Sequence, residues 1–109
     1  MNNKRRRLME LYVLYHTLHL DQLKEVNVML DDMQSLTKEN AMNCAKLMEK
    51  FLVNSKRWAE LENRAMDAGD NTEAVRRAME KMKIIAEANN GLYDSLKGIY
   101  DNDDRRGRA

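Results

Sequence analysis

Proline is absent from this sequence of 109 residues, and glycine is absent from Met1 through Ala68. Because these two residues interrupt an α-helix most strongly, a long stretch that lacks both can remain helical over many turns. The remaining composition agrees, since Leu, Met, Ala, Lys and Glu, which favour helices, are abundant. The sequence therefore predicts an all-α fold, with helices packed as an antiparallel bundle.

Other residue types are also scarce: cysteine occurs once, and aromatic residues make up only 6%. The lone Cys44 cannot form an internal disulfide, and it lies at an apolar helical position. A single thiol of this kind is typical of a protein in a reducing compartment, so we expect the protein in the cytoplasm. No apolar run approaches the length of about 20 residues that crosses a bilayer, which predicts no transmembrane segment. We expect one helical domain over residues 1–109, with a basic tail at 102–109.

The clearest interruption of the helical pattern is the segment 68–73. Gly69 can adopt the left-handed conformation that ends a helix. Asp70, with Glu73 three residues later, resembles a capping box for the next helix. Beyond it, one apolar stripe at heptad spacing predicts a helix over about 71–101, with Asn89 as its single polar member.

Before this turn, a second apolar stripe keeps its heptad phase from Leu23 to Ala68. The stripe becomes polar at Thr37 and Asn40, in the only earlier stretch that resembles a helix cap. The unbroken phase favours one continuous helix of about 60 residues, whereas the rarity of such long helices in globular proteins favours a break at this gap. The sequence alone therefore leaves both arrangements open.

In the first arrangement, three helices at about 4–36, 38–68 and 71–101 form an up-down-up bundle. In the second, the first two helices are one continuous helix, and the resulting long hairpin oligomerises through coiled-coil packing. The second arrangement requires a partner chain, because the last helix is too short to cover the whole of the long one.

Apolar residues in the segment 8–20 surround the helix and do not form a single stripe. One neighbouring helix would leave part of this apolar area exposed, so we expect a further protein surface to cover it. The cover is either a second copy of the chain, which makes a homo-oligomer, or a different protein. The candidate partner-binding residues are Leu8, Leu11, Tyr12, Leu14, Tyr15 and Leu18.

Polar and aromatic residues on the apolar stripes are candidates for an oligomer seam. An Asn at a core heptad position can pair with another Asn and fix the helix register, and Asn89 is the strongest candidate, opposite Asn54 and Asn40 in a hairpin or across a dimer. The alternative is that these positions face solvent. Phe51 and Trp58 lie seven residues apart on the same stripe and are expected anchors of the seam.

The charge distribution is uneven. Residues 4–7 carry +4 and residues 105–108 carry +3, so the rest of the chain carries −6 of a total of +1. Arginine-rich ends can contact phosphates without a folded groove, although no aromatic residues alternate with them to stack bases. The candidate phosphate contacts are Arg5, Arg6, Arg7, Arg105, Arg106 and Arg108.

Motifs that carry catalysis or bind cofactors are weak in this sequence. His16 and His19 have a spacing that two metal ligands can use, but no third histidine exists. The acidic residues 101–104 begin like a calcium loop but lack its glycine, and we expect them to fray the end of the last helix. We therefore expect no enzyme, and no catalytic, cofactor or metal site.

The sequence predicts a non-enzymatic helical interaction protein, with a structural, adaptor or chaperone-like role. It would act through helix-to-helix contacts with itself or with a protein partner. The alternative is a small nucleic-acid-associated protein that contacts phosphates through its arginine-rich termini.

Overall fold

The computed structural model of the chain describes residues 3–103, and the side chains of Lys4 and Arg5 are not described. It contains three long helices, α1 (Asn3–Asp31), α2 (Lys38–Ala68) and α3 (Thr72–Asn102), and a short 3₁₀ turn, η1 (Met33–Ser35). No strand occurs in the described part of the chain. The all-α prediction is confirmed, and of the two arrangements the structure has the one with three helices.

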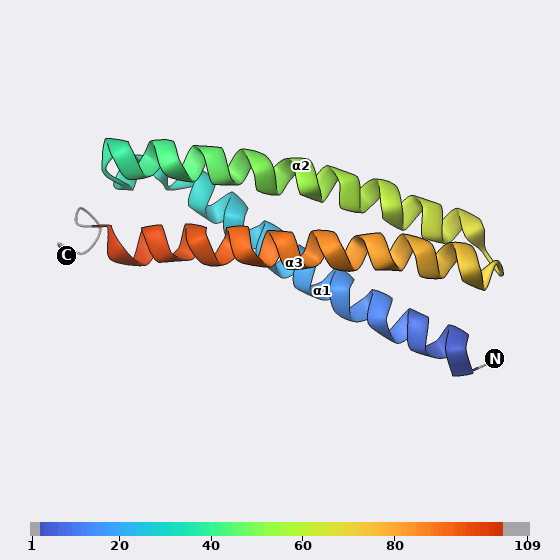
Figure 1. Cartoon of the computed structure of the whole chain (residues 1–109). Helices are drawn as coiled ribbons and strands as arrows, with labels where there is room; N and C mark the ends of the chain where they lie inside the picture. The colour runs from blue at the N-terminus through green and yellow to red at the C-terminus, as the bar shows by residue number, and fades with distance from the viewer. Residues whose placement is uncertain (1–2, 104–109) are drawn as a thin grey trace.

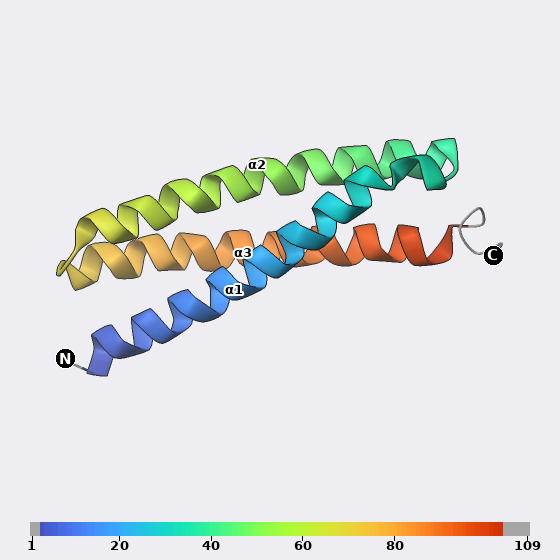
Figure 2. The same ribbon diagram turned by 180° about the vertical axis from the view of Figure 1, so that it is seen from behind.

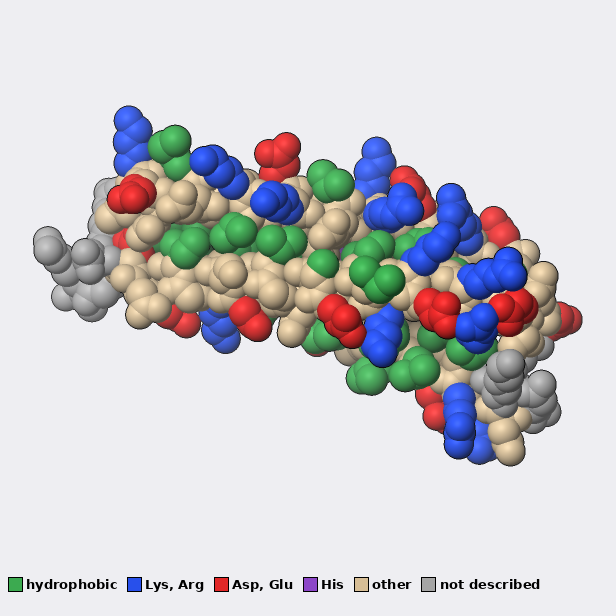
Figure 3. Space-filling view, viewed as in Figure 1, with side chains coloured by type: hydrophobic (Ala, Val, Ile, Leu, Met, Phe, Trp, Pro, Cys, Tyr) green, Lys and Arg blue, Asp and Glu red, His purple; other side chains and the backbone are tan. Residues whose placement is uncertain are grey.

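The helices form an elongated bundle that measures 55 × 20 × 18 Å. Helices α2 and α3 lie side by side as an antiparallel hairpin over their full length (Figure 1). Helix α1 crosses one face of this hairpin at an angle, and its N-terminal end diverges from the turn between α2 and α3 (Figure 2). On the opposite face, apolar side chains follow the line where α2 meets α3 (Figure 3).

Gly69 makes the sharp connection between α2 and α3. Its φ of 56° lies in the left-handed region, and its backbone N–H donates to the carbonyl of Met66 at 3.2 Å. The cap of the next helix differs from the prediction, because Asn71 and not Asp70 accepts the N–H of Ala74 through its side chain, at 3.1 Å. An Asn is as good an N-cap as an Asp, so the shift by one residue leaves the turn intact.

Helix α1 ends at Asp31, five residues before the predicted end at about 36. The physical reason is local hydrogen bonding: the Ser35 hydroxyl donates to the backbone oxygen of Asp32 at 2.7 Å and to its carboxylate at 3.0 Å. Such side-chain bonds compete with the helical backbone pattern. Leu36 is then buried in extended conformation, and Thr37 caps α2.

Asp103 closes the end of the bundle that lies opposite the α2–α3 turn. Its side chain is only 1% exposed, and its Oδ2 accepts from the Thr37 backbone N–H at 3.1 Å, the Thr37 hydroxyl at 3.1 Å and the Asn40 amide at 2.6 Å. A carboxylate at the N-terminus of α2 also matches the partial positive charge of the helix dipole. Of the acidic residues 101–104 expected to fray the end of the last helix, Asp103 follows the last helical residue, Asn102, and is held by these bonds, and Asp104 lies outside the described residues.

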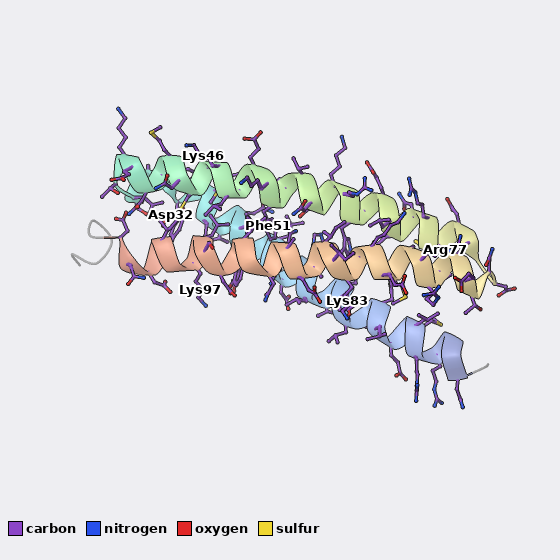
Figure 4. The ribbon with its side chains drawn as sticks, in the orientation of Figure 1. Asp32, Lys46, Phe51, Arg77, Lys83 and Lys97 are labelled. Carbon is purple, nitrogen blue, oxygen red and sulfur yellow. The ribbon has the colours of Figure 1, made fainter. Side chains whose placement is uncertain are left out.

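Two apolar clusters fill the interior of the bundle. The first lies toward the Asp103 end and contains Val26, Leu36, Cys44, Met48, Phe51, Leu96 and Tyr100. Figure 4 shows Phe51 between α2 and α3. The second lies toward the α2–α3 turn and contains Trp58, Leu61, Met79, Met82 and Ile85.

A polar layer crosses the middle of the bundle. The Asn54 amide donates to Asn89 Oδ1 at 3.0 Å, and Asn89 Nδ2 lies 3.5 Å from the carbonyl oxygen of Phe51, at the limit of a hydrogen bond. Gln22 of α1 donates to Asn90 Oδ1 at 2.8 Å. Asn89 is buried, so its amide depends on these partners in place of water.

Replacing Asp103 by Asn removes the charge that joins the end of α3 to the start of α2. We expect the free energy of unfolding, measured by urea denaturation, to fall by about 1–3 kcal/mol. The reason is that three donors, the Thr37 backbone N–H, the Thr37 hydroxyl and the Asn40 side-chain amide, lose a charged acceptor. The control is Asp101→Asn, an exposed position on the same helix that should change stability by less than about 0.5 kcal/mol. Equal effects of the two substitutions would contradict the role assigned to Asp103.

The Asn54–Asn89 pair predicts a result that depends on both residues. Asn89→Leu leaves the Asn54 amide facing an apolar side chain, and we expect a loss of about 1–2 kcal/mol in the free energy of unfolding. The double variant Asn54→Leu/Asn89→Leu removes both polar groups and should be at least as stable as the wild type. A double variant less stable than the single one would show that these two amides do not act as a pair.

Candidate functional site

The N-terminal half of α1 is the candidate functional site, and one of its faces is attached to the body of the protein. Leu8, Tyr12 and Tyr15 are partly buried against the apolar cluster around Trp58. The Tyr15 ring also meets the Trp58 ring edge-on, with ring centroids 6.4 Å apart. Half of the six predicted partner-binding residues therefore hold α1 to its own chain.

The other three predicted residues face outward. Leu11 is 43% exposed, Leu14 61% and Leu18 41%. They follow one another at spacings of three and four residues and so form one stripe along the helix. Met9, Val13 and Leu20 are also exposed, on the opposite flank of α1. Of these two exposed sets, the three leucines form the contiguous stripe.

Glu62 of α2 fixes α1 in place beneath this surface. Its Oε1 accepts the indole N–H of Trp58 at 2.6 Å and lies 2.6 Å from His16 Nδ1. The His16 ring in turn stacks on Tyr12, with centroids 5.7 Å apart. One carboxylate thus holds a core tryptophan and the first helix together, which fixes the rotation of α1 about its axis.

Burial changes the acid–base properties of two residues in this cluster. His19 is buried and stacks on Trp58 with ring centroids 5.0 Å apart. Burial lowers the pKa of His19, the nearby charge of Glu62 opposes this change, and His16 adds to it. Burial also raises the pKa of Tyr12, and the negative charge of Glu62, with its hydrogen bond, adds to the rise.

The two histidines singled out by their spacing are therefore engaged with different groups, His16 with Glu62 and His19 with the Trp58 ring. Residues 3–103 contain no cluster of three side chains able to hold a metal ion. Cys44 is fully buried, and that burial raises the pKa of its thiol, with a smaller contribution from Asp103. A thiol in this state is a poor nucleophile.

A groove opens where α1 diverges from the hairpin. It has a volume of about 250 Å³ and is lined by residues of all three helices and of the turn: Leu8, Met9, Tyr12, Ala65, Met66, Gly69, Thr72, Val75 and Met79. Its lining is mostly apolar, so the groove extends the apolar character of the α1 surface toward the turn.

The residues predicted for an oligomer seam lie inside the chain. Phe51, Trp58 and Asn89 are all buried, and they form contacts between the helices of one molecule. Asn40, expected opposite Asn89, is bound to Asp103 instead.

Of the arginines predicted to contact phosphates, Arg6 and Arg7 are exposed on the first turns of α1. Arg6 Nε lies 3.9 Å from a carboxylate oxygen of Glu10, one turn further along. The Arg5 side chain is not described, and Arg105, Arg106 and Arg108 lie outside the described residues. The structure therefore describes the side chains of two of these six arginines.

Comparison with known proteins finds no matching family model, no matching curated protein and no matching solved structure. No helix of the described chain has the length and apolar character needed to cross a membrane.

Sequence reasoning missed two residues, Glu62 and Asp103. Glu62 had a readable signal, because it lies four residues after Trp58 and so on the same face of α2 as the one indole N–H of the chain. Asp103 had no such signal, because its partner Thr37 is 66 residues away in the sequence.

The lowered pKa of His19 predicts a loss of stability in mild acid. Because the folded protein binds a proton at His19 less readily than the unfolded chain, unfolding is favoured once the pH falls below the ordinary histidine value of about 6.5. The stability contributed by neutral His19 is thus complete above that pH and decreases toward the lower folded-state pKa.

The measurement is urea denaturation between pH 7.5 and pH 5. His19→Phe retains an aromatic ring beside Trp58 but cannot be protonated, so its stability should fall less with decreasing pH than that of the wild type. Thr17→Val, at an exposed position of the same helix, is the matched control and should retain the wild-type pH dependence. An unchanged pH dependence in His19→Phe would contradict the assignment.

Proposed function

We propose that this protein is a helical interaction module that binds a helix of a protein partner, either its own or another's, through the outward stripe of α1. The observation that carries the proposal is the run of three exposed leucines, Leu11, Leu14 and Leu18, on one side of a helix whose other side is anchored to the core. The role that this supports is structural, adaptor or chaperone-like, and it requires no catalytic group.

The stripe differs from exposed apolar residues on α2 and α3. Single residues such as Val53 on α2 and Ile84 on α3 are also exposed, but isolated apolar side chains are normal on a protein surface. Three leucines that follow one another along a helix form a continuous patch, and such patches are typical of binding surfaces. Covering each leucine would contribute about 1–2 kcal/mol to association.

The anchoring beneath the stripe supports binding in a second way. The contacts of Glu62 with Trp58 and His16 hold the rotation of α1 before any partner arrives. A surface that is already ordered loses little conformational entropy on binding. The stripe is therefore presented in a fixed orientation, as a helix-to-helix contact requires.

The test is site-specific photocrosslinking in cells that produce the full-length protein. A photoreactive amino acid replaces Leu14 in one variant and Val53 in a second, matched variant of similar exposure on α2. We expect a discrete crosslinked protein from position 14, with a yield at least about tenfold above that from position 53, because a crosslink forms only where a partner is in contact. Similar yields from the two positions, or none from position 14, would refute the proposal.

A further inference from the structure

The leucine stripe continues at both ends into charged residues of opposite sign. At the same alternating spacing of three and four residues, Arg7 precedes Leu11, and Asp21 and Glu25 follow Leu18. All three charged residues are exposed on the same side of α1 as the leucines. We call the set Arg7, Leu11, Leu14, Leu18, Asp21 and Glu25 the α1 seam.

The sequence of the α1 seam is complementary to itself when two copies run in opposite directions. If Leu14 faces Leu14 of a second copy, then Arg7 faces its Asp21, and Leu11 lies within one residue of facing its Leu18. The two-fold symmetry of such a pair forms each of these contacts twice. In a parallel pair, by contrast, Arg7 would face Arg7 and Asp21 would face Asp21, which is repulsive.

We infer that the partner of this surface is a second copy of the chain, bound through the α1 seam in antiparallel orientation and centred on Leu14. This inference rests on the proposed function and identifies the occupant of that surface. The apolar centre supplies the attraction, and the Arg7–Asp21 pairs select the direction and register.

The opposite flank of α1 does not have this property. Met9, Val13 and Leu20 are exposed there, but the charged residues at the two ends of this set are Arg6 and Lys24, both basic, and Arg6 already lies 3.9 Å from Glu10 of its own helix. An antiparallel pair that brought the two ends of this flank together would place these cations near each other. The α1 seam, by contrast, has charges of opposite sign at its two ends.

The first test is charge reversal with the dissociation constant of the dimer as the readout, measured by sedimentation equilibrium at low salt. The wild type should dimerise. Arg7→Glu and Asp21→Arg should each weaken dimerisation by roughly tenfold, since each turns two attractive pairs into two repulsive ones. The double variant Arg7→Glu/Asp21→Arg restores attraction with the signs exchanged, and should dimerise within about threefold of the wild type.

Two further measurements use matched charge controls and test the orientation of the two helices. Lys46→Glu on α2 and Asp94→Arg on α3 change the net charge equally at exposed positions and should leave dimerisation unchanged. A mixture of the Arg7→Cys and Asp21→Cys proteins should give a mixed disulfide under mild oxidation. The wild type should give none, since Cys44 is buried.

Three outcomes would overturn self-pairing: a wild type that remains monomeric at all concentrations, a double variant as weak as the single variants, or disulfides that form only between identical variants. If the wild type is monomeric but position 14 crosslinks to a different protein, the interaction module stands and self-pairing alone is overturned. If the wild type is monomeric and position 14 gives no crosslink, both proposals are overturned.

Discussion

The end of the molecule that carries the candidate site depends on the burial of Trp58 among three helices. Its ring meets Tyr15 and His19 of α1, its N–H is bound by Glu62 of α2, and its cluster includes Met82 of α3. Because the indole is large and carries one polar atom, it requires both an apolar enclosure and a single acceptor. Because Tyr15 and His19 help to enclose this ring, the face of α1 that carries them is turned inward, and the leucine stripe faces outward.

The opposite end combines an apolar cluster of its own with polar contacts between the helix ends. There the charged side chain of Asp103 joins the end of α3 to the first turn of α2, and the Tyr100 hydroxyl donates to the backbone oxygen of Met29 at the end of α1. Charged and hydroxyl hydrogen bonds are directional, whereas apolar packing tolerates sliding. The polar end therefore fixes the alignment of the helices along their length, and the Trp58 end fixes the rotation of α1.

Much of this fold could be predicted from the sequence, and the limits have physical causes. Helices α2 and α3 agree with their predicted ranges to within one residue, because Gly69 and the apolar stripes mark them directly. The end of α1 was misplaced because short-range bonds of Ser35 replace helical ones. For the candidate site, apolar residues on every side of α1 identify the segment but not the side that faces the body. That choice depends on Glu62 and Trp58, which lie far along the chain on α2.

The paths of α1 and α3 have a mechanical consequence. Both helices run from the end near the α2–α3 turn toward the opposite end, so the start of α1 and the end of α3 lie at opposite ends of a bundle 55 Å long (Figure 1). A force that separates these two positions is directed along the helix axes, and it loads the contacts between α1 and the hairpin in shear. Side-chain contacts along the length then resist together, whereas a force that peeled one helix away would break them one after another.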